Sequence, residues 1–217
     1  MLTNYYAVTH PSQPNYVASA GGDYFGMNND NLNKIPANIS SVADLLEAGG
    51  VSWGEYQERM PFTGFQGFQF LNPDGANDYV RKHKWVTRVV QQSPFFGLIS
   101  PSLASPLIIY DSVADSTTRS ANIKNFTLFE EDLANNALPQ WMFITPNMSR
   151  FSRVIFEIIV IIILSFFTHN SFYNIANDGH DTNVTFAGTF INSFLPPLLK
   201  NPNFNTEKTL VLLSRFF

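Results

Sequence analysis

The stretch LTNYYAVTHPSQPNYVASA, residues 2–20, places a β-rich run directly before the start of a helix. Residues 2–8 alternate loosely between apolar and polar side chains, which predicts a strand. Ser12 then suits the N-cap of a helix, Pro14 suits its first turn, and residues 15–20 continue it. A strand that leads at once into a helix is typical of α/β folds, whose ligand sites form where strands end and helices begin.

The rest of the chain continues this alternation of strands and helices. One predicted helix carries Phe126, Phe129 and Leu133 on a single face. Together the elements predict an α/β fold with a largely parallel sheet. They are a helix at 40–49 with Ser40 or Ser41 as N-cap, a strand within 51–61 with Trp53 in the core, a loop at 62–79, a buried strand at 106–112, a helix at 126–139, a strand at 140–147, a helix at 182–199 ended by Pro196 and Pro197, and a last strand at 208–217.

The bulk composition bounds the class of protein. With 217 residues, 45% of them hydrophobic, the chain can bury one sizeable core, which predicts a single domain or most of a larger one. A net charge of −4 without a dense Lys/Arg cluster argues against a nucleic-acid partner, since neutralising phosphates takes a concentrated basic patch. The chain has no cysteine, so we expect neither a disulfide nor a thiolate metal site.

Two features bear on secretion and on membranes. Sequons for N-glycosylation at Asn38, Asn125, Asn147 and Asn183 suit a secreted glycoprotein, although such triplets also arise by chance in Asn-rich sequence. The start, MLTNYYAV, does not read as a signal peptide, so secretion would need a longer precursor. The apolar run at 154–167 is shorter than the roughly 20 residues of a spanning helix, so we expect no membrane segment.

Ser12 has two interpretations from the pattern alone. Most serines at a strand-to-helix junction only cap the helix. The same position, at the positive end of a helix dipole, would also face any anion at the edge of the sheet. Ser12 is therefore also placed as a nucleophile for phosphate chemistry would be.

Several blocks of the sequence carry a family resemblance. THPSQPNYVASAGGDYFG at 9–26, with SWGEYQERMP, GANDYVRKH, LPQWMFITPNM and NDGHDTNVTFAG, resembles the fungal acid phosphatases of the phosphoesterase family. That family also includes phospholipase C-type enzymes and looks like a branch of the alkaline phosphatase superfamily. The resemblance implies a three-layer α/β/α sandwich that hydrolyses small phosphate esters through a phosphorylated side chain and a divalent metal ion. It also implies a secreted or cell-wall protein.

The resemblance assigns roles to individual residues. Ser12 matches the nucleophile, which is also a metal contact, because a neutral hydroxyl needs a metal or a base to form its alkoxide. Asn15 matches the residue whose amide contacts a phosphoryl oxygen, with a local hydrogen bond in the first turn as the alternative. His10 is a candidate phosphate contact or a structural residue. Glu55 and Tyr56 are expected to shape the cleft, with no catalytic step assigned.

The block NDGHD at 177–181 is the second candidate cluster. His180 is expected to assist at the metal or to protonate the leaving alkoxide, and Asp178 and Asp181 are candidate metal ligands. Asp181 has an alternative as the cap of the helix that starts at Thr182.

The sequence departs from the family pattern at both ends and in two inserts. The acidic pair expected before the first strand is missing, and Arg215 with two Phe stands where acids should follow the last strand, so we expect poor metal retention. Residues 84–105 and 149–176 interrupt blocks that the family joins nearly directly. We interpret both as translated introns within one partial domain. Genuine surface insertions are the alternative, which the apolar second insert fits poorly.

The sequence therefore predicts an acid phosphatase-like hydrolase that works through a phosphoserine intermediate, inactive as written if its metal ligands are truly missing. Two alternatives stay open. One is a phospholipase C-type phosphodiesterase with the same nucleophile and a different pocket. The other is a non-catalytic truncated paralogue.

Overall fold

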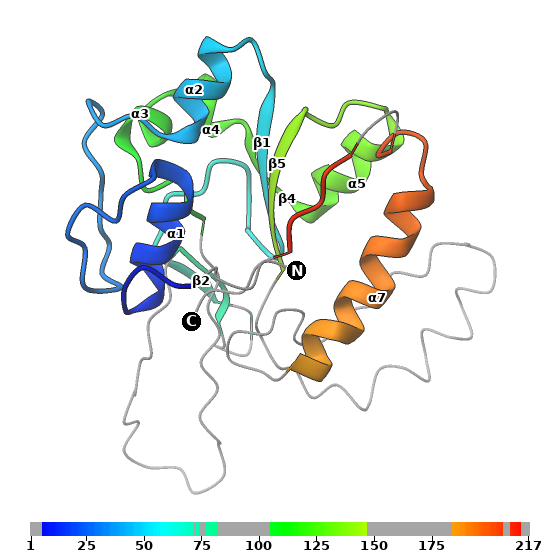
Figure 1. The fold of residues 1–217 in the computed structure, drawn as a ribbon, viewed down its shortest axis with the longest axis horizontal. Helices are drawn as coiled ribbons and strands as arrows, with labels where there is room; N and C mark the ends of the chain where they lie inside the picture. The colour runs from blue at the N-terminus through cyan, green and yellow to red at the C-terminus, as the bar shows by residue number, and fades with distance from the viewer. Residues whose placement is uncertain are drawn as a thin grey trace, which may run out of the picture.

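The computed structural model describes residues 6–71, 73, 77–81, 105–146, 184–205 and 209–213. Figure 1 shows its helices and strands. In chain order they are α1 (Ser12–Gly21), α2 (Val42–Ala48), β1 (Trp53–Gln57), β2 (Gln69–Leu71), β3 (Asn77–Val80), α3 (Asp111–Ala114), α4 (Thr117–Ser120), β4 (Ile123–Asn125), α5 (Phe126–Ala134), β5 (Trp141–Thr145) and α7 (Val184–Lys200).

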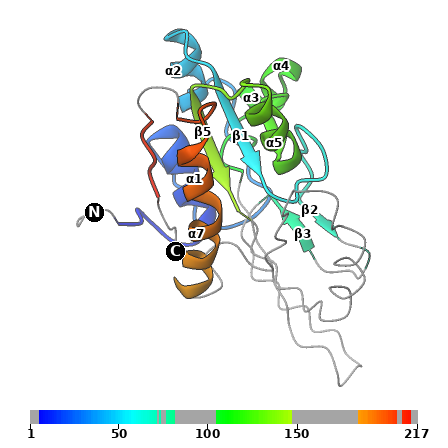
Figure 2. The ribbon, with the colours of Figure 1, turned by 90° about the vertical axis from the view of Figure 1, so that its right-hand side faces the viewer.

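The centre of the fold is a parallel sheet of three strands in the order β4-β1-β5. β1 is the middle strand, and all five of its residues are buried, as expected for a parallel strand with helices on both sides. Figure 2 shows β1 and β5 side by side, both pointing toward the separate antiparallel pair β2–β3.

Helices cover both faces of this sheet (Figure 1). On one face, side chains of α1 and α2 pack with Trp53 of β1 into the larger core cluster. On the other face, Tyr56 of β1 packs with Phe129 of α5 and Leu198 of α7. Because successive side chains of a strand point to opposite faces, β1 serves both clusters. A parallel sheet with helices on each face supports the predicted α/β class, and the alkaline phosphatase-like three-layer sandwich stays a prediction.

Helix ends form where the local sequence supplies caps. α2 begins after Ser41, whose backbone N–H donates to the Asp44 carboxylate at 2.8 Å in a capping box. α5 begins after Asn125, whose side-chain oxygen accepts a hydrogen bond from the Leu128 N–H at 3.1 Å. Both helices were expected, as were the strands now seen as β1 and β5.

Ser12 does not cap α1. It is the first helical residue, and Pro11 occupies the N-cap position. Upstream, the described part of the predicted first strand, residues 6–8, is not a strand, and Tyr6 and Val8 are 75% and 61% exposed. Residues 2–5 lie outside the described residues. A β-rich pattern needs a neighbouring strand to pair with, and these three residues have none among the described elements.

The predicted strand at 106–112 is also wrong, although its burial was expected. Residues 107–110 are fully buried but form a turn, in which the Tyr110 N–H donates to the Leu107 carbonyl at 3.1 Å. A single parallel bridge joins Ile35 to Tyr110. A short apolar run is buried in either conformation, so its composition does not distinguish a strand from a buried turn.

Three further expectations need correction. The predicted loop at 62–79 contains β2 and most of β3. α7 continues through Pro196 and Pro197, whose side chains are exposed while Phe194 and Leu198 pack into the core cluster with α5. That packing offsets the hydrogen bonds that the two prolines cannot make. Residues 209–213, expected in a last strand, are not a strand, and Leu210 is 82% exposed.

Most of both predicted inserts, residues 84–104 and 149–176, lies outside the described residues, as does the apolar run at 154–167. Among the helices that are described, none is long and apolar enough to cross a membrane.

Candidate functional site

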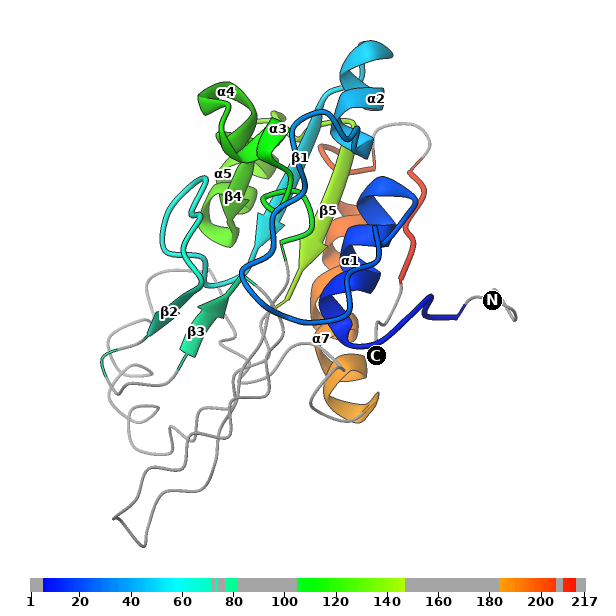
Figure 3. The same cartoon turned by 90° about the vertical axis from the view of Figure 1, so that its left-hand side faces the viewer.

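The first turn of α1 holds the predicted nucleophile. Ser12 is 3% exposed, and Gln13 and Asn15 are similarly buried. Figure 3 shows this turn at the same end of the fold as the arrowheads of β1 and β5. The carboxyl ends of parallel strands are where ligand sites of α/β folds form, and a helix N-terminus there adds free N–H groups and a positive partial charge.

The amide of Asn15 is fully engaged with the backbone that precedes α1. Its Oδ1 accepts hydrogen bonds from the N–H groups of Val8 at 2.9 Å and Thr9 at 3.1 Å. Its Nδ2 donates to the carbonyls of Thr9 at 2.9 Å and Pro11 at 3.1 Å. This is the local hydrogen bonding that the sequence left open as the alternative. The phosphoryl contact stays a prediction, and it would need one of these donor bonds to be exchanged.

An acidic and an amide side chain hold the neighbouring Gln13. The Gln13 backbone N–H donates to Asp30 Oδ1 at 2.9 Å, so one free N–H of the helix start already faces a carboxylate. The Gln13 side-chain oxygen accepts from Asn33 Nδ2 at 2.5 Å. Two loop residues after α1 therefore hold its first turn in place.

The other predicted site residues do not join this turn within the described structure. His10 lies in the segment before α1 and is exposed. Asp178, His180 and Asp181 lie outside the described residues, so the structure does not place them. Within the described ranges, no group of three or more His, Asp or Glu side chains could hold a metal ion.

A buried polar cluster lies on the same face of the sheet as α1. The sequence analysis expected Glu55 to shape the cleft, but it did not predict this cluster. Its centre is Glu55 of β1, which is fully buried. One carboxyl oxygen accepts a hydrogen bond from the Leu107 N–H at 3.2 Å, and the other accepts a short one from Gln57 Nε2. Gln57 also donates to Thr145 Oγ1 at 3.0 Å, which links β1 to β5.

Burial dominates the electrostatics of this cluster. Removal from water raises the pKa of Glu55 to about 7, although neighbouring hydrogen bonds oppose the rise. Burial also raises the pKa of Tyr79 and lowers that of Arg81, both close by. Among the described residues, the Nε of Arg81 has no hydrogen-bond partner. Glu55 is thus a carboxyl group that stays mainly neutral at acid pH.

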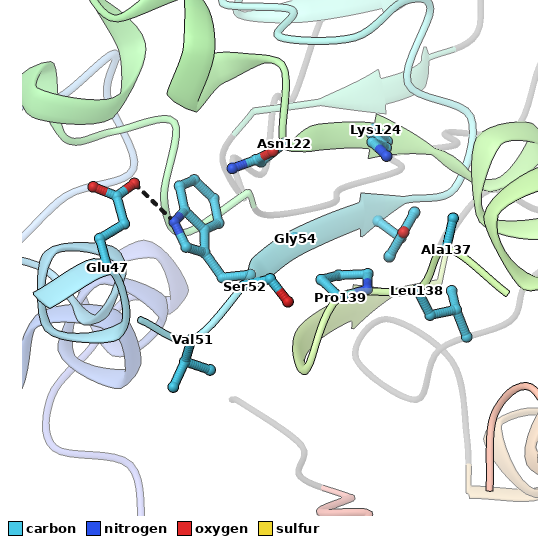
Figure 4. A pocket seen from close by; sticks show the side chains of 11 residues that line it. Glu47, Val51, Ser52, Gly54, Asn122, Lys124, Ala137, Leu138 and Pro139 are labelled. Carbon is cyan, nitrogen blue, oxygen red and sulfur yellow. Dashed lines mark hydrogen bonds between the residues drawn. The ribbon is translucent and has the colours of Figure 1, made fainter. Parts of the chain in front are cut away.

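A hollow at the opposite end of the sheet is shown in Figure 4. Its charged groups are already paired. Glu47 accepts from the Trp53 indole at 3.0 Å, and Lys124 lies 2.6 Å from Asp132 Oδ2, which also accepts from the Tyr56 hydroxyl at 2.6 Å. The hollow opens at the amino ends of the strands, away from the start of α1, and its paired lysine is a poor anion site. It is lined by Glu47, Val51, Ser52, Trp53, Gly54, Tyr56, Asn122, Lys124, Ala137, Leu138 and Pro139.

Comparison with known proteins gives one consistent result. The sequence profile of the Phosphoesterase family matches residues 1–214. An acid phosphatase of Aspergillus fumigatus is 47% identical over 99% of this chain and 37% of its own length. A phosphate-repressible acid phosphatase of Penicillium chrysogenum is 44% identical over 99% of this chain and 40% of its own length. An acid phosphatase of Aspergillus niger is 40% identical, with the same coverage as the Penicillium protein. The chain thus spans about 40% of the length of these relatives.

Proposed function

This chain belongs to the phosphoesterase family. On that premise we propose that it is part of an acid phosphatase that hydrolyses small phosphate monoesters. The observation that carries the proposal is the position of Ser12. Its hydroxyl stands in the buried first turn of a helix at the carboxyl end of a parallel sheet. The names of the relatives, all acid phosphatases, favour monoesters over diesters.

In the proposed reaction, the Ser12 oxygen attacks phosphorus and its hydroxyl proton passes to solvent water, which also supplies the proton for the leaving alcohol. The bond from phosphorus to the ester oxygen breaks, and the alcohol leaves after taking up a proton. Water then attacks the phosphoserine and releases inorganic phosphate and the serine hydroxyl. The dipole of α1 favours this charge development, because its positive end lies at Ser12, although the Gln13 N–H already donates to Asp30 and Pro14 has no N–H.

The remaining site residues have auxiliary roles in the proposal. Asn15 would contact a phosphoryl oxygen after giving up its bond to the carbonyl of Thr9 or Pro11. His10 is exposed and able to meet the substrate, and His180 would assist the leaving group. A divalent ion held by Ser12, Asp178 and Asp181 stays a prediction.

The test compares alanine substitutions of two serines in α1, Ser12 and Ser19. We expect Ser12→Ala to reduce hydrolysis of p-nitrophenyl phosphate at acid pH by roughly a thousandfold or more, because the proposed covalent intermediate forms on the Ser12 oxygen. Ser19→Ala is the matched control, since Ser19 lies in the same helix but is exposed. Acid quenching during turnover, followed by peptide mass spectrometry, should find phosphate on Ser12.

Two results would contradict the proposal. One is activity that survives Ser12→Ala, and the other is a phosphorylated peptide that lacks Ser12. Faster cleavage of bis(p-nitrophenyl) phosphate than of the monoester would instead identify a phosphodiesterase. If turnover is too slow to follow, calorimetric binding of vanadate, lost in Ser12→Ala and kept in Ser19→Ala, makes the same comparison.

A further inference from the structure

The segment at residues 105–110 is the most deeply buried connection in the described fold, and we call it the buried turn. Ser105 and residues 107–110 all have exposed fractions of 0%. Such a segment must find hydrogen-bond partners for its backbone inside the protein, because water cannot reach it. Its partners come from three separate parts of the chain.

Two side chains hold the buried turn to the sheet side of the fold. Glu55 of β1 accepts a hydrogen bond from the Leu107 N–H at 3.2 Å. Arg81, just after β3 and 2% exposed, donates to the Ile108 carbonyl at 2.8 Å. Glu55 is itself fixed by Gln57, which reaches across to Thr145 of β5.

The same turn holds α1. The Tyr110 hydroxyl donates to the carbonyl of Val17 in the middle of α1 at 3.1 Å. A Cβ placed on Gly21 would overlap that hydroxyl, so helix and turn are in direct contact. The Ile35 N–H donates to the Ile109 carbonyl of the turn, and the Ile35 carbonyl accepts from the N–H of Asp111, just after the turn. Asn33, two residues before Ile35, donates to the side chain of Gln13.

We propose that Glu55 is a positioning residue: by holding the buried turn to β1, it sets the place of α1 and therefore of the Ser12 hydroxyl at the end of the sheet. The catalytic meaning of this inference rests on the proposed function of Ser12. The path itself runs from Glu55 to Leu107, through Tyr110, to Val17.

A carboxyl group suits this role better than an amide. Both oxygens of Glu55 accept N–H donors, one from the backbone of Leu107 and one from Gln57, and each oxygen keeps a lone pair that can accept when the carboxyl is protonated. A glutamine at this place has a single acceptor oxygen, so one of the two donors would face an NH₂ group. An unpaired buried donor destabilises the fold, and we expect the Glu55→Gln protein to relieve this by moving the buried turn.

The first measurement does not depend on activity. Hydrogen–deuterium exchange with mass spectrometry compares the wild-type chain with Glu55→Gln. We expect exchange to rise by roughly tenfold in peptides covering the buried turn and α1, with peptides covering α5 changed by less than about twofold. The matched control is Phe129→Leu, which loosens the core cluster on the other face and should show the reverse pattern.

A second variant breaks only the last link of the path. Tyr110→Phe removes the hydrogen bond to Val17 and keeps the ring. We expect faster exchange in α1 with little change in the buried turn. This variant keeps the inference testable if Glu55→Gln does not fold.

Kinetic measurements then show whether displacement of α1 affects catalysis. If Ser12 is the nucleophile, Glu55→Gln should lower kcat by roughly tenfold or more with KM within about twofold, because substrate still binds while the hydroxyl is misplaced. When both variants are assayed equally far below their own Tm, Phe129→Leu should leave kcat nearly unchanged. Equal losses of kcat in both variants would reduce Glu55 to a purely structural role and overturn the inference.

The two proposals fail in different ways. Unchanged exchange in α1 for both Glu55→Gln and Tyr110→Phe overturns the positioning role, whatever Ser12 does. Activity that survives Ser12→Ala overturns the proposed function, while the exchange data still decide whether Glu55 positions α1.

Discussion

At the scale of single residues, the most consequential group is the buried carboxyl of Glu55. Its pKa is raised to about 7 from the ordinary 4.5 because the charged form is removed from water. The folded protein therefore holds a proton at pH values where the unfolded chain has released it. The resulting stabilisation is fully present below about pH 4.5 and is lost as the pH rises through about 7.

This predicts a pH dependence of stability that one substitution removes. From about pH 4.5 to about pH 8, ionisation of Glu55 should lower the free energy of unfolding by roughly 3 kcal/mol, and Glu55→Gln should flatten that part of the profile. Urea unfolding followed by tryptophan fluorescence at several pH values measures it. Glu131→Gln, an exposed acid on α5, is the control and should keep the wild-type slope. The same slope in Glu55→Gln would show that another group is responsible.

At the scale of elements, α1 is placed by close contact with the buried turn as well as by its own sequence. Gly21, its last residue, has no room for a side chain. An added Cβ would overlap the Tyr110 hydroxyl and lie 3.1 Å from the ring carbon Cζ. The close approach of Tyr110 therefore leaves space only for glycine at the end of α1.

Gly21→Ala should therefore destabilise the protein by roughly 1–3 kcal/mol, although alanine favours helices in general. Tyr110→Phe in the same chain should recover part of this loss, since the overlapping oxygen is gone. Thermal unfolding of the single and double variants measures the coupling. Gly49→Ala is the control because its nearest neighbour to a new Cβ, the Leu45 carbonyl, is 3.4 Å away. Purely additive effects of Gly21→Ala and Tyr110→Phe would contradict this account.

At the scale of the whole molecule, one short sheet separates two core clusters. The cluster with α1 and α2 contains Val17 and Trp53, and the cluster with α5 and α7 contains Tyr56 and Phe129. The two clusters share β1 but no side chain. Residues that are well separated and share no partners contribute independently to stability.

We expect Val17→Ala and Phe129→Leu each to cost about 2 kcal/mol, and the double variant to cost their sum within about 0.5 kcal/mol. Chemical denaturation followed by circular dichroism gives all three values. A single cooperative transition with an unchanged denaturant slope is expected, because β1 joins both faces. Strong coupling between the two substitutions would mean that the faces communicate through the sheet.

Elements with strong local signals could be predicted from the sequence. Ser41 and Gly49 bracket α2, Phe126 and Phe129 mark the buried face of α5, and WGEYQ forms β1 as expected. The phosphoesterase family was identifiable from its sequence blocks, and SQPN correctly indicated a helix start at Ser12, although it predicted Ser12 as the N-cap and the structure has it as the first helical residue. These signals act within a few residues, through caps, periodicity and turn chemistry, so they can be recognised in the sequence alone.

Only the tertiary structure decided the rest. The apolar run at 107–110 became a buried turn, and α7 passed through its prolines because Phe194 and Leu198 pack against α5. Glu55 became the centre of a buried cluster through Leu107, 52 residues further along the chain. Burial, strand pairing and the pKa of a carboxyl depend on which distant residues surround a group, and folding alone brings those residues together.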